Sequence, residues 1–318
     1  MPHCQCSIYN LKGVPSNEFK TFTSVNGRKH PVPIFDIFCP HAHYELTELL
    51  RASTRADGHF TDVSVYKRKE KGGSLSHVVL KTVDPYDSHR EAGSVGLIER
   101  LGAYRRERLG FVRAKLLHES TCKSCNPEEP SDWSAIVMQK YECTLHCLCL
   151  VTMEQKMHAF KQIVRATLRL WQCNLAYLDF KETNVLFSSA GGQSTYVLCD
   201  HGAVEIVGTT HGSATYPPPT NPFGTEVSAD AINVCWGLGS LLVLLLEPRF
   251  EEQLRYVSNK EENEAGHNQP IKFTLAILEV RRAFKNYPQA IQNLLDTCWS
   301  TFVGKPLTAV RDVYNACH

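Results

Sequence analysis

Hydrophobic and polar positions alternate along the first half of the chain in the manner of β-strands. The clearest case is the pair of runs "VSVYKRK" and "SHVVLKTV", which flank the polar turn "EKGGS". Alternation with a period of two around a Gly-Gly turn predicts a β-hairpin. The runs "GFVRAKLLHE" and "SAIVMQKY" predict further strands. Residues 1–43 are polar and irregular apart from "PVPIFDIFCPH" and are expected to form an N-terminal extension.

Helical spacing of apolar residues becomes dominant after residue 141. Before that point only "PYDSHREAGSVGLIERLGAYRRE" has this spacing. Afterwards "EQKMHAFKQIVRATLRLWQCN" predicts an amphipathic helix, "WGLGSLLVLLL" a buried one, and "KFTLAILEVRRAF" and "YPQAIQNLLDTCWSTF" two more. A β-rich half over residues 44–141 and a helical half over residues 142–318 predict an α+β fold with two lobes and a cleft between them.

Composition and charge exclude several classes of protein. The chain has 318 residues, of which 43% are hydrophobic, enough to build a sizeable core. A net charge of +1 provides no field for nucleic acid or a membrane surface, so neither partner is expected. No apolar run reaches the length of a membrane span, and the first residues lack the pattern of a secretory signal.

Cysteine usage indicates a reducing compartment. The 13 cysteines are an odd number and often lie inside apolar runs, which predicts reduced thiols in a cytoplasmic or nuclear protein. The cluster "CKSC" has zinc-like spacing, but no second pair follows at a suitable distance. The clusters "CPHAH" and "CTLHCLC" lack the repeated knuckle of a zinc motif, so we favour incidental cysteines over structural zinc.

The stretch "NLAYLDFKETNVLFSS" carries the strongest chemical signal. It places Asp179, Lys181 and Asn184 between an apolar helix and a strand, and a second acid, Asp200, follows the next strand. An acid can take a proton from a hydroxyl, a lysine can neutralise a transferring phosphoryl group, and amide and carboxylate oxygens can hold a metal. Each residue alone would be an ordinary loop residue, but their combination predicts phosphoryl transfer.

These motifs resemble those of the protein kinase superfamily. "YLDFKETN" is similar to the catalytic loop H-R-D-x-K-x-x-N, and "DHG" is similar to D-F-G. The resemblance implies that Asp179 is the catalytic base and that Asn184 and Asp200 are metal ligands. It implies ATP with Mg²⁺ or Mn²⁺ as cofactors and a protein substrate. Lys181 implies specificity for serine and threonine rather than tyrosine.

The resemblance extends toward the N-terminus. "HVVLK" resembles the V-A-I-K strand, which implies that Lys81 binds the α- and β-phosphates. The next helix should supply its acidic partner, with Glu91 as first candidate and Glu99 as second. "ADGHFTDV" stands where the glycine-rich phosphate loop is expected, with Gly58 as the one retained glycine and Val63 at the roof of the adenine pocket.

The resemblance also covers the later segments, so that it runs from about residue 44 to 318. "IVMQKYECTL" resembles the strand into the hinge, with Met138 as gatekeeper and the backbone from Gln139 to Tyr141 for adenine. "GSATYPPPT" resembles the end of the activation segment, with Ser213 in the threonine position. "WGLGSLL" resembles the long buried helix, and "GKPLTA" resembles the R-P-T-A feature.

Several departures from the family pattern leave the activity open. Tyr177 and Leu178 replace the His and Arg of the catalytic loop, and Val234 replaces the acid of the long helix. Thr220 and Lys305 stand where the family has a Glu and an Arg that form an ion pair with each other. An active serine/threonine kinase is therefore weighed against a pseudokinase that binds nucleotide or acts as a scaffold, and against a kinase-fold enzyme for small molecules. In this divergence the sequence resembles kinases of large DNA viruses, including the herpesvirus type.

Overall fold

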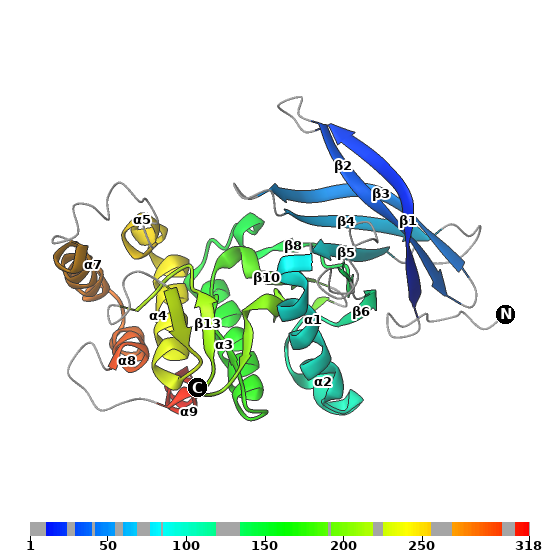
Figure 1. Cartoon of the computed structure of the whole chain (residues 1–318). Coiled ribbons are helices and arrows are strands. Elements are labelled where there is room, and N and C mark those ends of the chain that lie inside the picture. Colours follow the sequence, from blue (N-terminus) through cyan, green and yellow to red (C-terminus); the bar gives the residue numbers. More distant parts are fainter. Residues whose placement is uncertain are drawn as a thin grey trace. The chain divides into compact units, whose positions relative to one another are not determined.

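The computed structural model divides into two compact units. It describes residues 11–23, 29–39, 42–54, 60–68, 77–83, 85–118, 134–189, 192–218, 225–255, 269–300 and 309–317. The first unit comprises Met1–Glu107 and Val112–Lys140, and the second comprises Arg108–Phe111 and Tyr141–His318. The predicted α+β fold, β-rich at first and helical afterwards, is confirmed by this structure (Figure 1).

An antiparallel sheet of seven strands dominates the first unit (Figure 1). The predicted hairpin is confirmed: β4 and β5 pair from Thr61–Val83 to Lys67–His77. In spatial order the strands are β1 (Lys12–Thr23), β2 (Lys29–Cys39), β3 (Ala42–Thr54), β4 (Phe60–Arg68), β5 (His77–Val83), β7 (Ser134–Gln139) and β6 (Ala114–His118).

Strands β1 and β2 fall in the segment that the sequence pattern left irregular, and that expectation is wrong for residues 12–23 and 29–39. Val32, Phe35 and Ile37 of β2 are at most 1% exposed and pack in one cluster with Tyr66 and Leu80. The prolines that alternate through "HPVPIF" cannot donate to a strand ladder, which explains why the segment lacked a strand signature. The N-terminal segment therefore supplies part of the core of this unit.

The two edge strands of the sheet, β1 and β6, lie against each other. The Lys115 Nζ donates a hydrogen bond of 2.8 Å to the carbonyl of Leu11. Gly13 packs so closely on Leu117 that a Cβ at Gly13 would lie 2.3 Å from the Leu117 Cδ2. The sheet thus curls until its edges meet, and its concave face encloses the apolar cluster.

Helices α1 (Pro85–Arg100) and α2 (Ala103–Arg108) follow β5. The predicted helix over this segment is confirmed. Ala92, Val95 and Ile98 recur at a spacing of three residues and are all buried, and the helix contacts β6 and β7. This packing fixes the position of Glu91 on the first buried turn of the helix.

The second unit is mainly helical. Its helices are α3 (Met153–Trp171), α4 (Ala231–Leu246), α5 (Glu251–Leu254), α7 (Gln269–Phe284), α8 (Gln289–Cys298) and α9 (Val310–Cys317). Its short strands are β8 (Cys143–Thr144), β9 (Leu175–Tyr177), β10 (Val185–Ser188), β11 (Thr195–Leu198), β12 (Val204–Ile206), β13 (Thr210–Ser213) and β14 (Thr225–Ser228). The 3₁₀ turns are η2 (Leu145–Cys147), η3 (Glu182–Asn184), η5 (His201–Ala203) and η6 (Pro248–Phe250).

Helix α3 begins at a capping box. The Thr152 hydroxyl accepts from the backbone of Gln155, and the Gln155 side chain accepts from the backbone of Thr152. The predicted amphipathic character is confirmed: Phe160, Val164 and Leu170 are buried, whereas Leu168 is only partly buried. Helix α3 packs against α4, α9, β9 and β11.

Helix α4 forms the core of the second unit, and each residue from Val234 to Leu246 is buried. Its two glycines admit large rings: a Cβ at Gly237 would lie 2.5 Å from Phe180, and one at Gly239 would lie 2.3 Å from Trp299. Trp299 stacks on Trp236 with ring centroids 4.6 Å apart. Across the parts of the chain that the structure describes, none of the helices has both the length and the apolar character needed to cross a membrane.

Candidate active site

Asp179 lies in a dense network of hydrogen bonds in the loop between β9 and η3, and it is 8% exposed. The Asn184 side-chain amide donates to the Asp179 carbonyl at 3.1 Å and to its carboxylate Oδ2 at 2.9 Å. Lys181 forms an ion pair with the same carboxylate. Lys181 and Asn184 therefore converge on the Asp179 carboxylate, as expected for a loop that holds an acid in a fixed orientation.

Thr215 is a fourth member of this network. Its backbone N–H donates to the Asp179 Oδ1 at 3.2 Å, and its hydroxyl accepts from the Lys181 Nζ at 3.2 Å. The resemblance to kinases implied that Ser213 holds the threonine position of the activation segment. The side chain of Ser213 lies outside the described residues. A threonine 36 positions from Asp179 gave no local signal, and only its place two residues after Ser213 in "GSATY" pointed to it.

Apolar and aromatic packing holds the loop at its N-terminal side. Leu178, in the position of the expected arginine, is 5% exposed, and its N–H donates to the carbonyl of Ala203 at 3.0 Å. The Tyr177 hydroxyl donates to the carbonyl of Cys199 at 2.8 Å, and burial raises the pKa of Tyr177 well above its usual value. The tyrosine therefore stays a protonated donor that ties the loop to the strand before Asp200.

Asp200 follows β11 and adopts a left-handed backbone conformation with φ of 69°. This conformation is uncommon for a residue other than glycine and often marks functional sites. The Cys199 N–H donates to the Asn184 carbonyl at 2.9 Å, which ties the segment of Asp200 to the segment of Asn184. His201, in the place of the expected phenylalanine, is 2% exposed and packs edge-on against Phe111 at 4.9 Å.

The oxygen donors of this region suit a hard divalent cation. The Asn184 amide nitrogen is used by Asp179, so its amide oxygen is the atom left to bind a cation. The Asp200 carboxylate adds a charged oxygen, and Mg²⁺ and Mn²⁺ prefer such ligands. The donor chemistry therefore fits the implied metal. Within the described residues no three His, Cys, Asp or Glu side chains gather as a metal site, and "CKSC" lies outside them.

In the first unit Lys81 forms an ion pair with Glu91. The two side chains are only 16% and 11% exposed, so water screens the pair weakly. Val63 pairs in register with Lys81, and Val79, two residues before Lys81, pairs with Met138. Val63, Lys81 and Met138 therefore share one face of the sheet, because alternate residues of a strand point to the same side.

The remaining predicted residues are placed as follows. The N–H of Gln139 donates to the carbonyl of Arg113 at 3.1 Å and is thus already used within the first unit. Tyr141 is partly exposed. Gly58 lies outside the described residues, as do Thr220 and Lys305. Glu99, the second candidate for the partner of Lys81, accepts a hydrogen bond from Arg106 through its backbone carbonyl.

Comparison with known proteins agrees with this description. Among solved structures, the chain is similar to the kinase PK-1 of Cydia pomonella granulovirus, with a TM-score of 0.55 and 18% identity over 85% of this chain and 92% of that one. The chain therefore has a protein kinase-like fold, as predicted. More specifically, it is similar to a viral protein kinase. No model of a protein family matches the sequence, and no curated protein matches it.

Proposed function

We propose that the chain is a protein kinase that transfers the γ-phosphoryl group of ATP to serine and threonine hydroxyls. The observation that carries this proposal is the network in which Lys181, Asn184 and Thr215 all contact the Asp179 carboxylate. Phosphoryl transfer requires little covalent chemistry and much positioning. A carboxylate with three fixed contacts meets that requirement.

Each residue has a definite role in this proposal. The Asp179 carboxylate orients the acceptor hydroxyl and takes its proton. Lys181, held between Asp179 and the Thr215 hydroxyl, offsets negative charge on the phosphoryl group as it moves. Asn184 and Asp200 would hold Mg²⁺ or Mn²⁺, which supplies charge neutralisation at the phosphates when bound.

Lys81 would bind the α- and β-phosphates. Its ion pair with Glu91 supports this role because the pair limits the rotamers that the long lysine side chain can adopt. Val63 and Met138 share its sheet face and offer apolar surface for adenine. Specificity for serine and threonine rests on Lys181 and its contact with Thr215.

The test is phosphoryl transfer by the full chain. Purified protein is incubated with γ-labelled ATP, Mg²⁺ and a generic basic protein substrate. The control is the double variant Asp179→Asn and Asp200→Ala, which retains the charge of Lys181 and the Lys81–Glu91 pair. Incorporation of label on serine or threonine well above this control is expected. Incorporation no greater than the control would refute the proposal.

A second candidate is a kinase-fold protein that binds nucleotide or partners without transfer. It is favoured by two apolar residues, Leu178 and Val234, where the family has an arginine and an acid that brace the loop. Because both side chains are uncharged, neither can supply an ionic brace. Both are buried, at 5% and 0% exposure, and can hold the loop only by apolar packing. A rise in melting temperature with Mg-ATP but no transfer above the double variant would select this candidate over the first.

A further inference from the structure

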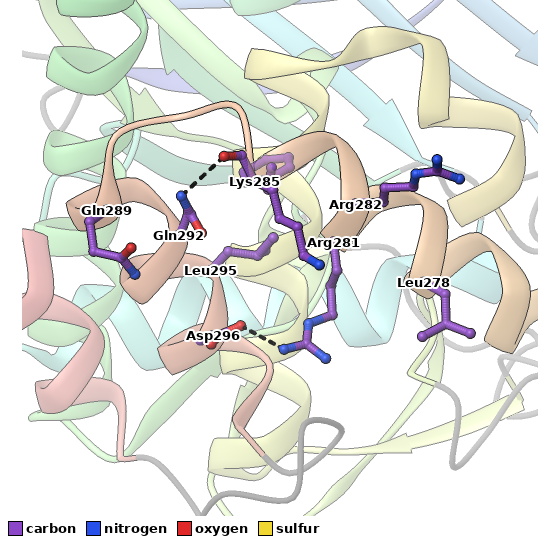
Figure 2. A pocket seen from close by; sticks show the side chains of 9 residues that line it. Leu278, Arg281, Arg282, Lys285, Gln289, Gln292, Leu295 and Asp296 are labelled. Atoms are coloured by element: carbon purple, nitrogen blue, oxygen red, sulfur yellow. Dashed lines mark hydrogen bonds and ion pairs between the residues drawn. The ribbon is translucent and has the colours of Figure 1, made fainter.

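Helices α7 and α8 enclose a groove of about 390 Å³ in the second unit, lined by nine residues (Figure 2). Its volume lies within the range of ligand pockets, about 300–1,000 Å³. Phe284 and Leu295 line it as buried apolar residues, each 2% exposed. Leu278 lies at the α7 side and is 55% exposed. The groove thus has a firm apolar floor and a solvent-facing apolar rim.

The lining carries a surplus of positive charge. It includes three cations, Arg281, Arg282 and Lys285, and one acid, Asp296. Figure 2 shows Arg281 extending from α7 toward Asp296 on α8, with 3.5 Å between the Nη2 and Oδ1 atoms. Asp296 offsets the charge of Arg281, so the lining keeps the charges of two cations, Arg282 and Lys285. No ion pair of Arg282 or Lys285 exists with any residue that the structure describes.

The turn that carries Lys285 is held in place from α8. The Gln292 side-chain amide donates to the carbonyl of Tyr287 at 2.8 Å. It also donates to the carbonyl of Lys285 at 3.4 Å (Figure 2). Lys285 therefore projects from a backbone that is already fixed before any ligand arrives. A preformed site loses less entropy on binding than a flexible one.

Exposed leucines adjoin the cations. Leu275 and Leu278 are one turn apart on α7 and are 54% and 55% exposed. A single exposed leucine needs no explanation, but two neighbours beside a charged groove form a continuous apolar and basic surface. Such a surface matches a ligand that has aliphatic and acidic groups side by side.

We propose that this groove docks an acidic peptide segment of a partner protein, with carboxylates at Lys285, Arg282 and Arg281 and an aliphatic side chain over Leu275 and Leu278. Charge complementarity selects the acidic ligand because the whole chain is nearly neutral, at +1, and the surplus here is local. The leucines and the apolar floor favour a peptide over nucleic acid, which is bound chiefly by cations along a phosphate backbone. Docking here does not depend on phosphoryl transfer.

Binding is measured on the full chain by fluorescence anisotropy. The probe is a labelled synthetic peptide of interspersed glutamate and leucine, and the reference probe has glutamine for each glutamate. The test variant is Arg282→Glu with Lys285→Glu. The matched control is Lys67→Glu with Arg311→Glu, which makes the same charge change at two exposed cations elsewhere. Melting temperature verifies that each variant is folded.

The glutamate peptide is expected to bind the parent and the control at least about tenfold more tightly than the Arg282/Lys285 variant. The parent is also expected to bind the glutamate peptide at least about tenfold more tightly than the glutamine peptide. Leu275→Ser with Leu278→Ser should weaken binding several-fold without changing its salt dependence. Equal binding by both charge-reversal variants would overturn the proposal, as would equal binding of both peptides or absence of binding. Displacement of the peptide by a DNA oligonucleotide at equal concentration would overturn it in favour of a nucleic-acid surface.

Discussion

Replacing Gly237 by alanine is expected to disturb the loop that carries Asp179, the proposed catalytic loop, from inside the core. A Cβ at this position would lie 2.5 Å from the Cδ2 of Phe180 and 3.3 Å from its Cε2. Phe180 directly follows Asp179 and is 2% exposed, so its ring has no free space into which to turn. Because every residue of α4 from Val234 to Leu246 is buried, the backbone of Gly237 has little room to retreat.

The magnitude follows from these distances. Ordinary contact begins at 3.4 Å, so the ring must move by about 0.9 Å from 2.5 Å. Overpacking of this kind costs about 1–3 kcal/mol, and the better helix propensity of alanine returns about 1 kcal/mol. We therefore expect a net loss of up to about 2 kcal/mol in the free energy of unfolding. A displacement near 1 Å at a catalytic group can lower a rate by about 100-fold.

Gly239→Ala is the matched control. Its Cβ would also clash, at 2.3 Å from the Trp299 Nε1, but Trp299 is not part of the loop that carries Asp179. Both variants should melt at lower temperature than the parent. Only Gly237→Ala should lower the rate of phosphoryl transfer by about tenfold or more. It alone should also speed hydrogen exchange at the Leu178 amide, which bonds to Ala203 at 3.0 Å.

Two results would refute this reasoning. Unchanged exchange at the Leu178 amide in Gly237→Ala would show that Phe180 does not transmit the clash to the loop. An equal effect of Gly239→Ala on that amide would show that general destabilisation of α4 is the cause. The exchange measurement decides the matter whether or not the chain transfers phosphate.

Three further predictions concern single side chains. Asn184→Ala removes two hydrogen bonds to Asp179 and is expected to lower the free energy of unfolding, measured in urea, by about 1–3 kcal/mol. It should also reduce phosphoryl transfer at least about 100-fold, and transfer at the parental rate would contradict the role of Asn184. Thr215→Val keeps the N–H contact with Asp179 but removes the hydroxyl that accepts from Lys181, so kcat should fall about tenfold while the KM for ATP stays constant; a change confined to KM would contradict this. Burial raises the pKa of Asp62 from 3.8 to about 6, so the folded state retains a proton that the unfolded chain releases, and stability falls as pH rises through this window. Asp62→Asn should flatten that fall and stabilise the protein at pH 7 by up to about 3 kcal/mol, and equal pH profiles for both proteins would refute the prediction.

Local patterns account for the parts that the sequence predicted. The hairpin of β4 and β5 follows from strict alternation around a turn, and α1, α3 and α4 follow from apolar spacing. Three members of the Asp179 network, Asp179, Lys181 and Asn184, could be predicted because they lie within six positions of each other. Where neighbours in sequence are neighbours in space, a pattern carries the necessary information.

Long-range contacts account for the parts that were missed. Strand β2 is stabilised by packing against Tyr66 and Leu80, and its prolines obscure its own strand pattern. Thr215 joins the network only through the fold of the second unit. The groove beside Lys285 depends on the approach of α7 to α8, which the two amphipathic segments do not themselves specify. For β2 and for Thr215 the deciding interaction joins residues that are far apart in the sequence.

The place of β1 and β2 in the sheet limits how far the chain can be shortened from its N-terminal side. A version that begins at residue 44, where the motifs begin, would lose Val32, Phe35 and Ile37 and leave Tyr66 and Leu80 facing water. It would also turn β3 into an open edge with unpaired backbone groups, which is a template for strand addition between molecules. Such a shortened protein should aggregate on expression, whereas one that retains the chain from Leu11 onward should stay monodisperse in size-exclusion chromatography.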